Sequence, residues 1–326
     1  MPRSPRSVGR LVALTGASGF VGGHIAQALV AAGWQVRVLM RRPPSGPPLA
    51  ALPVDVVSGS LADRGSLQRL VEGADAVVHV AGVVRARTRR AFFQVNADGV
   101  ANLLAAVHAT AGGGAMPHFL LLSSLAARAP AVSAYAASKR AGEDMLRARA
   151  GPVPWTILRP PVIYGPRDRN TLAFFRIIAK GIAPLPAPDA ARVSCLHASD
   201  LAAAVCTLLT AAEAMSGQIC EIDDGCAGGY SWRTMIETAA AHLGVRPRFV
   251  RIPAPLLNVV AAMAAGAGLV TGTAPILTPG KVREIRHLDW VCRDTRMQTH
   301  TAWRPRVPLD TGFARTVAWY RREKWL

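Results

Sequence analysis

The sequence predicts an α/β fold: a doubly wound parallel sheet covered by helices on both faces, followed by a smaller C-terminal lobe. Three observations support this prediction. A short apolar run at residues 11–14 leads through a glycine-rich turn into a helical pattern at 24–32. Apolar runs and helical stretches then alternate through the first half of the chain. The 326 residues, 51% of them hydrophobic, can bury a large core.

Glycines follow the first predicted strand at three-residue spacing, at Gly16, Gly19 and Gly22. Between a strand and a helix, such glycines allow a tight turn, close approach of a pyrophosphate and close helix–strand packing. The N-terminus of the helix adds free N–H groups that attract phosphate. A glycine-rich loop without a ligand is the alternative. We predict a dinucleotide site with the loop residues Gly16, Ser18, Gly19, Phe20, Val21 and Gly22.

The alternation that follows is typical of parallel strands joined by right-handed crossovers. Ligands of such sheets lie beyond the carboxyl ends of the strands. We expect a dinucleotide-binding Rossmann domain at 1–165, with its sheet completed by about 190–225, and a substrate lobe at 166–189 and 226–326. The further predicted strands are 35–40, 54–57, 76–80, 119–122 and 155–158, and the predicted helices are 66–72, 92–110 and 135–148.

The end of the second predicted strand is where such a fold selects its cofactor. An acidic residue there would accept hydrogen bonds from the adenosine ribose, but Met40 stands in that place and is followed by Arg41 and Arg42. A guanidinium offers a charged, bidentate grip on a 2′-phosphate. The sequence therefore favours NADP(H), and NAD(H) remains the alternative if both arginines point into solvent.

A second candidate catalytic segment contains Ser123 and Ser124, which follow a predicted strand, and Tyr135 and Lys139, which lie on the next predicted helix. Residues at i and i+4 share a helix face, so the ammonium can lie near the phenol. A nearby cation stabilises the phenolate and lowers the tyrosine pKa. A serine at the strand end could orient a substrate hydroxyl or carbonyl. On an ordinary amphipathic helix the same pair would be plain surface.

Together these motifs resemble the extended short-chain dehydrogenase/reductase family, which includes NAD(P)-dependent epimerases/dehydratases, dihydroflavonol reductases and 3β-hydroxysteroid dehydrogenases. The resemblance runs from about residue 10 to the C-terminus, with His197 and Asp200 also in familiar places. The segments that carry it are Thr15-Gly-x-x-Gly-x-x-Gly22, Ala81-Gly82, Asn96, Ser123-Ser124, Tyr135-x-x-x-Lys139 and Leu158-Arg-Pro-Pro-Val-Ile-Tyr-Gly-Pro166.

The resemblance implies a role for each matching residue. Tyr135 would be the acid/base, Lys139 would hold the nicotinamide ribose and depress the Tyr135 pKa, and Ser124 would bind the substrate oxygen. Asn96 matches a family asparagine whose role is catalytic or structural. The remaining cofactor contacts would be Ala81 and Gly82, Ser60 and Leu61 near the adenine, and Pro161 and Val162 beside the nicotinamide.

Departures from the family pattern help to choose among its branches. Leu125-Ala126 replaces the Asp-Glu pair of the dehydratases, so dehydration is not expected. Val162 replaces an asparagine that contacts the pyrophosphate of sugar nucleotides. The apolar segment 253–277 suits a hydrophobic alcohol or ketone, and Arg167, Arg169 and Arg192 could bind an anionic group. We expect an oxidoreductase that interconverts a hydroxyl and a ketone. A sugar-nucleotide epimerase and a non-catalytic nucleotide-binding protein are the alternatives.

The formal net charge of +18 is spread along the chain without a nucleic-acid-binding signature, so no nucleic acid partner is expected. The five cysteines lack CxxC spacing, which favours reduced thiols in a cytoplasmic protein and no metal site. The arginines and prolines of residues 1–10 read as a frayed leader. Glycines weaken segment 253–277 as a membrane span, although contact with a membrane surface stays open.

The resemblance also predicts a homodimer. Family members pair the helices that correspond to 96–110 and 135–147 across a two-fold axis. Ala101, Leu104, Ala105 and His108 have the helical spacing of one shared face.

Overall fold

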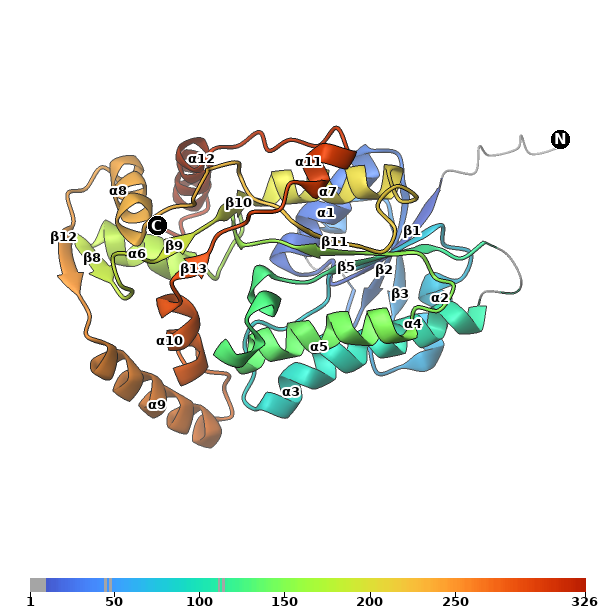
Figure 1. Ribbon diagram of the computed structural model, residues 1–326, viewed down its shortest axis with the longest axis horizontal. Helices are drawn as coiled ribbons and strands as arrows, with labels where there is room; N and C mark the ends of the chain where they lie inside the picture. The colour runs from blue at the N-terminus through green and yellow to red at the C-terminus, as the bar shows by residue number, and fades with distance from the viewer. Residues whose placement is uncertain (1–9, 44–45, 47–48, 111, 113–114) are drawn as a thin grey trace.

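A parallel sheet with helices on both faces forms the centre of the computed structural model, which describes residues 10–43, 46, 49–110, 112 and 115–326 (Figure 1). Among these residues, seven strands form one sheet in the order β11-β6-β5-β4-β1-β2-β3. Every pairing is parallel, as in the alignment of Val12 on β1 with Ala76 on β4. The strands are β1 (Leu11–Thr15), β2 (Gln35–Met40), β3 (Val54–Ser58), β4 (Ala76–His79), β5 (His118–Leu122), β6 (Trp155–Arg159) and β11 (Gln218–Glu221). The doubly wound prediction is confirmed.

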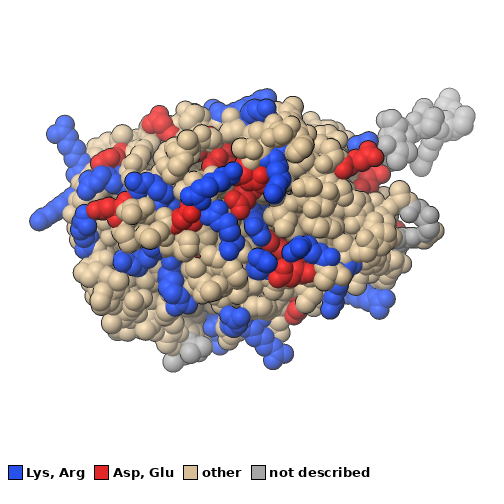
Figure 2. Space-filling view, viewed as in Figure 1, with Lys and Arg blue, Asp and Glu red and all other residues tan. Residues whose placement is uncertain are grey.

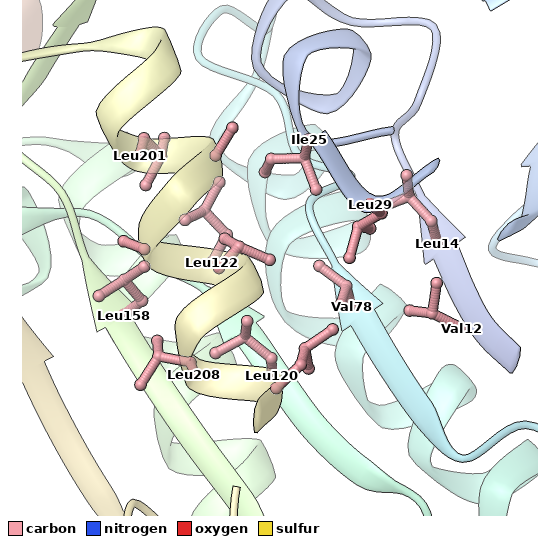
Figure 3. Close-up of a cluster of buried hydrophobic side chains, with 14 of the residues drawn as sticks. Val12, Leu14, Ile25, Leu29, Val78, Leu120, Leu122, Leu158, Leu201 and Leu208 are labelled. Atoms are coloured by element: carbon pink, nitrogen blue, oxygen red, sulfur yellow. The ribbon is translucent and has the colours of Figure 1, made fainter. Parts of the chain in front are cut away.

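Two hydrophobic layers sandwich the sheet because successive residues of a strand point to opposite faces. Val12 and Leu14 point toward α1 (Phe20–Ala31) and α7 (Ala198–Thr210), where the leucines of Figure 3 interdigitate. Ala13 lies in the layer under α2 (Arg64–Val71), α4 (Gly99–Thr110) and α5 (Ala134–Arg149). Burial on both faces explains why these strands read as continuous apolar runs.

The rest of the chain builds a smaller lobe beside the carboxyl edge of the sheet (Figure 1). Its core joins aromatic rings from distant segments, including Tyr164, Phe175 and Phe313. Its helices are α6 (Leu172–Ala179), α8 (Trp232–Leu243), α9 (Ala254–Thr271), α10 (Pro279–Arg286) and α12 (Leu309–Arg322), whereas α11 (Arg296–His300) lies against β11 of the main sheet. Its short parallel pairs are β7 (Val162–Tyr164) with β10 (Cys195–His197), β8 (Ile182–Leu185) with β12 (Arg248–Arg251), and β9 (Arg192–Val193) with β13 (Asp289–Trp290).

Two helices differ from their predicted forms. The first begins at Phe20 instead of residue 24, because Gly19 caps it and the glycines at 22 and 23 lie inside it. The helix predicted at 92–110 begins earlier, as α3 (Arg89–Phe93), and contains a π-helical turn at Gln94–Asp98 before α4. Such turns insert an extra residue into the helical ladder and occur often at functional sites. Periodicity alone gives no sign of this one.

The proposed dimer face needs one correction. Leu104 is 1% exposed and packs into the core under α4, so it cannot contribute to an interface. Ala105 and His108 on the same helix are exposed, and α4 and α5 pack side by side. The homodimer itself stays a prediction.

In the described part of the chain, no helix has the length and apolarity to span a membrane. The five cysteines are all unpaired, and the predicted leader falls almost wholly outside the described residues.

Gly22 allows α1 to begin directly against the preceding turn. A Cβ at this position would lie 2.0 Å from the Gly16 carbonyl oxygen, which is backbone and cannot move aside cheaply. We predict that Gly22→Ala lowers the free energy of unfolding by about 1–3 kcal/mol, the usual cost of overpacking. Thermal denaturation would measure the loss. Gly266→Ala is the matched control, because nothing lies within 4 Å of a Cβ there. An unchanged melting temperature for Gly22→Ala would contradict the close-packing argument.

Candidate active site

The glycine turn lies at the carboxyl edge of β1, where it leaves room for a phosphate group. Gly16 has a φ of +79°, in the left-handed region that favours glycine, and its carbonyl accepts a hydrogen bond from Gly19 N at 3.0 Å. A Cβ on Gly16 would lie 2.6 Å from the backbone nitrogen of Ala81, after β4. The loops that follow β1 and β4 therefore touch. The free N–H groups at the start of α1 face this point.

A cleft of about 1250 Å³ opens over this turn. One wall is formed by predicted cofactor residues, including Ser18, Gly19 and Phe20, and continues through Arg41 and Arg42 after β2. Both arginines are exposed. The opposite wall comes from the C-terminal lobe, and only its two arginines were singled out from the sequence. Its residues are Arg167, Arg169, Asn170, Trp319, Glu323 and Trp325.

The far wall is organised by a cation–aromatic contact. The Arg169 guanidinium lies 4.7 Å from the ring centre of Trp325, and Arg167 adopts a left-handed φ of +74° that is uncommon for a side-chain-bearing residue. Of the three arginines that could bind an anion, Arg167 and Arg169 line this cleft. Arg192 instead donates to the backbone carbonyls of Asp189 and Ala191. No local motif links the C-terminal tryptophans to the cleft, so sequence reasoning missed them.

The other predicted cofactor residues lie after neighbouring strands at the same edge of the sheet. Leu61, after β3, packs against Gly99 at the start of α4, and its carbonyl accepts a hydrogen bond from Asn102. Ser60 uses its hydroxyl locally, as an acceptor for the Ala62 N–H. Pro161 and Val162 follow β6, and the Val162 side chain is 45% exposed. Contact of these residues with the cofactor remains a prediction.

The structure separates the roles of the two serines after β5. Ser123 is buried and donates a hydrogen bond of 2.5 Å to Glu143 Oε1 on α5. Ser124 caps a short 3-10 turn, with its hydroxyl oxygen accepting from Ala126 N at 3.2 Å. Its hydroxyl also forms a hydrogen bond with Tyr135. This geometry supports Ser124, the last serine after the strand, as the residue that would meet a substrate oxygen.

Tyr135 has a raised pKa, opposite to the direction expected from its neighbour Lys139. Burial raises the pKa of the phenol to about 12, the hydrogen bond with Ser124 lowers it, and the charge of Glu284 adds to the increase. Lys139 does not contribute to this shift. In this structure the phenol therefore remains protonated at neutral pH, which suits a proton donor.

Lys139 lies beneath Tyr135 with its ammonium held inside the protein. Nζ donates a 2.7 Å hydrogen bond to the Leu122 carbonyl, and burial lowers the lysine pKa to about 8, against the opposing charge of Glu143. A Cβ on Gly82 would lie 3.7 Å from Nζ, so the loop after β4 passes close to the ammonium.

Glu143 completes a buried charge network that the sequence analysis missed. It is 1% exposed and forms two hydrogen bonds with Arg159, of 2.9 Å and 2.6 Å. Arg159 in turn lies 3.7 Å from Glu221 on β11. Because Glu143 is one helical turn after Lys139, the spacing Tyr135–Lys139–Glu143 was the available signal.

Asn96 lies in the π-helical turn and uses its whole amide to hold other elements. Its Oδ1 accepts from Val83 N at 2.8 Å, and its Nδ2 donates to the Val83 carbonyl and to Ser138 Oγ. It therefore ties the loop after β4 to α5, between Gly82 and Lys139. This bonding supports the structural one of its two predicted roles.

A second cavity, of about 160 Å³, opens on Tyr135 from the side of the lobe. Glu284 on α10 lines it and accepts hydrogen bonds from Ser133 and, at 2.8 Å, from Lys281. Helix α9 was expected to line the substrate site, but only the loop after it does so. The apolar members of the lining are Val84, Phe92, Ala134, Pro275 and Ile276.

A parallel sheet with a glycine turn at its carboxyl edge and a Tyr-Lys helix beside that turn is typical of nicotinamide-dependent oxidoreductases. Residues 12–222 match the model of the NAD dependent epimerase/dehydratase family, and the chain belongs to this family. The resemblance to extended short-chain dehydrogenases/reductases is thereby confirmed. The chain is an oxidoreductase with a nicotinamide cofactor, so the non-catalytic alternative is set aside.

Similar proteins with named activities include reductases, and an epimerase is among the solved structures that share the fold. A ceramide reductase of Caulobacter vibrioides is 40% identical over 316 residues, which cover 97% of this chain and 96% of that protein. A (4-alkanoyl-5-oxo-2,5-dihydrofuran-3-yl)methyl phosphate reductase of Streptomyces griseus is 31% identical over 201 residues, which are 61% of this chain and 63% of that protein. The solved UDP-glucose 4-epimerase of Thermotoga maritima shares the fold, with a TM-score of 0.74 at 18% identity over 96% of this chain and 99% of that one.

The contact of Glu143 with the lysine site predicts a measurable change in the Lys139 pKa. Glu143→Gln removes a charge that favours the ammonium, so we expect the Lys139 pKa to fall below about 8. The chain has only four lysines, so NMR titration of their side-chain carbons can resolve this group, assigned with Lys139→Arg.

Asp144→Asn serves as the control, because Asp144 is the next residue but is exposed and pairs with Arg140 at 3.0 Å. We expect it to leave the Lys139 titration in place. If both variants gave the same midpoint as the unaltered protein, Glu143 would have no electrostatic influence on Lys139.

Proposed function

We propose that the protein reduces a ketone on an apolar substrate with NADPH, using Ser124, Tyr135 and Lys139. One observation carries the proposal. Tyr135 lines the cavity on the side of the lobe, while Lys139, one helical turn further on, lies near Gly82 in the loop that also touches the glycine turn. The phenol therefore stands between a place for substrate and a place for the cofactor.

The proposed chemistry follows from what each group can do at neutral pH. When bound, the nicotinamide would supply the hydride for the carbonyl carbon. Ser124 and Tyr135 bind the carbonyl oxygen, and Tyr135 donates the proton that the developing alkoxide needs. A pKa of about 12 keeps Tyr135 in the donor form across the physiological range. Lys139, with a pKa of about 8, is mostly charged at neutral pH and would hold the ribose hydroxyls.

The charge around the cleft supports NADP(H) over NAD(H). Arg41 and Arg42 are exposed on the cleft wall at the end of β2, where the adenosine ribose of a dinucleotide lies in this fold. Arg167 and Arg169 line the other wall. A 2′-phosphate placed there would meet guanidinium groups from both sides.

A lipid ketone is the substrate class that we propose. The cavity at Tyr135 is lined by apolar side chains such as Phe92 and Ile276, of which Ile276 is 64% exposed, together with the charged Arg85, Lys281, Arg283 and Glu284. The name of the 40% identical ceramide reductase points to the same class. Leu125-Ala126 and Val162 replace residues that sugar-nucleotide enzymes use. Epimerase activity stays the second candidate because the fold is shared with UDP-glucose 4-epimerase.

Replacement of Tyr135 tests the assignment. Tyr135→Phe keeps the ring, which packs 6.3 Å from Phe92, but deletes the proton. We predict unchanged NADPH binding and a loss of about 10²–10⁴-fold in kcat, the usual share of general acid catalysis. NADPH absorbance with a panel of long-chain β-keto amides would measure it, and parallel assays with UDP-sugars would detect epimerisation.

Tyr164→Phe makes the same chemical change at a hydroxyl that has no hydrogen-bond partner among the described residues. We expect it to retain activity. Near-normal turnover of Tyr135→Phe would remove Tyr135 from the mechanism.

Arg41→Ala tests the cofactor preference. A charge-assisted hydrogen bond to a 2′-phosphate is worth about 1.5–3 kcal/mol, so we predict a 10-fold to 100-fold higher KM for NADPH. The KM for NADH should stay constant, because NADH has no 2′-phosphate. An unchanged ratio of NADPH to NADH efficiency would overturn the role of Arg41.

A further inference from the structure

Helix α9 carries an apolar outer face that no other element of the described chain covers. Leu256, Val259, Val260 and Met263 recur at helical spacing and are 54%, 56%, 47% and 70% exposed; we call them the outer stripe. Isolated exposed apolar residues are ordinary, but a continuous stripe of them marks an interaction site.

The opposite face of α9 holds the helix against the lobe. Ala261 is fully buried, Leu257 is half-buried, and a Cβ on Gly268 would lie 3.0 Å from the Pro275 side chain. Small residues therefore pack inward and larger apolar residues point outward. This division is the reverse of a helix built to fill a protein core, where the larger side chains would be inside.

Basic residues flank the helix on both sides. From residue 246 to 286 the chain has six Lys or Arg residues and a single acidic residue, Glu284, which is 7% exposed and paired with Lys281; of the six, Arg251 is paired with Asp189. The helix itself, Ala254–Thr271, contains no charged residue. In Figure 2 the lower left of the visible face, where Figure 1 places α9, is uncharged and has Lys and Arg side chains beside it. An apolar stripe with a basic border complements an anionic lipid surface.

The outer stripe also leads toward the reacting group. The loop after α9 contributes Pro275 and Ile276 to the cavity that opens on Tyr135, and Lys281 and Arg283 of α10 line the same cavity. A molecule leaving a lipid layer at α9 would pass these residues before reaching the phenol.

We infer that α9, through its outer stripe and basic flanks, docks on an anionic phospholipid bilayer and receives its ketone substrate from that bilayer. The choice of a bilayer rests on the excess of positive charge, which would oppose the packing of a second copy of this chain against the same face. The substrate part of the inference rests on the proposed function, whereas the docking part does not.

Flotation with vesicles tests the docking without any turnover. We expect the unaltered protein to bind vesicles of phosphatidylcholine with phosphatidylglycerol, to bind phosphatidylcholine alone more weakly, and to be released by salt. Val259→Asn/Met263→Asn should weaken binding about tenfold or more, because each apolar side chain loses its burial in lipid. Arg246→Gln/Arg248→Gln should weaken binding only to the anionic vesicles.

Val56→Asn/Ile177→Asn is the matched control. It removes two apolar side chains that are 39% and 40% exposed elsewhere on the surface, and it should leave vesicle binding intact. Circular dichroism confirms that each variant is folded. Absence of binding by the unaltered protein, or equal loss in the control, would overturn the inference. The inference would also be overturned if light scattering showed that the unaltered protein is a dimer and that Val259→Asn/Met263→Asn is a monomer.

Two ketones separate this inference from the proposed function. We expect the outer-stripe variant to reduce a short, water-soluble ketone at the unaltered rate and a long-chain ketone in anionic vesicles about tenfold more slowly. Equal rates in vesicles would contradict substrate delivery through α9. Vesicle binding without reduction of either ketone would refute the proposed reaction and leave the docking intact.

Discussion

The structure depends on the contact between the glycine turn and the start of α1. Gly22 lets the helix begin against the backbone of Gly16, and Gly16 in turn touches the backbone after β4. Backbone atoms that approach this closely leave no room for side chains, and the Ala81 N–H after β4 donates to the Thr15 hydroxyl at 3.2 Å. The same contact sets the position of α1 on the sheet, where Ile25 and Leu29 meet the leucines of α7 (Figure 3). The phosphate site and the core of this face therefore share one constraint.

A second constraint lies behind the tyrosine. Lys139 and Glu143 extend from one face of α5, and the pairs Glu143–Arg159 and Arg159–Glu221 connect that face to β6 and β11. A buried charge is costly unless it is paired. The network keeps Lys139 near the strand end while burial lowers its pKa to about 8. It also engages Ser123, which leaves Ser124 as the hydroxyl that interacts with Tyr135.

The C-terminal lobe supplies what the Rossmann sheet lacks. Arg169 and Trp325 close the outer side of the dinucleotide cleft, and Glu284 adds a negative charge near Tyr135 that raises its pKa. The lobe also carries α9 at its surface, close to the entrance of the Tyr135 cavity. The proposed cofactor selection and the proposed access of substrate, like the acidity of the phenol, therefore involve contacts between residues far apart in the chain.

The sequence by itself determined the alternation of strands and helices, the glycine turn and the Tyr135–Lys139 pair, because each depends on local spacing. The apolar run at 11–14 became β1 because a strand buried on both faces needs continuous hydrophobicity, whereas 35–40 became β2 with Arg37 in its middle, paired with Asp55 of β3. Only the tertiary structure decided the raised pKa of Tyr135, the burial of Leu104 and the place of Trp325 on the cleft. Desolvation, burial and long-range contacts depend on which segments meet in space, and no local pattern records that.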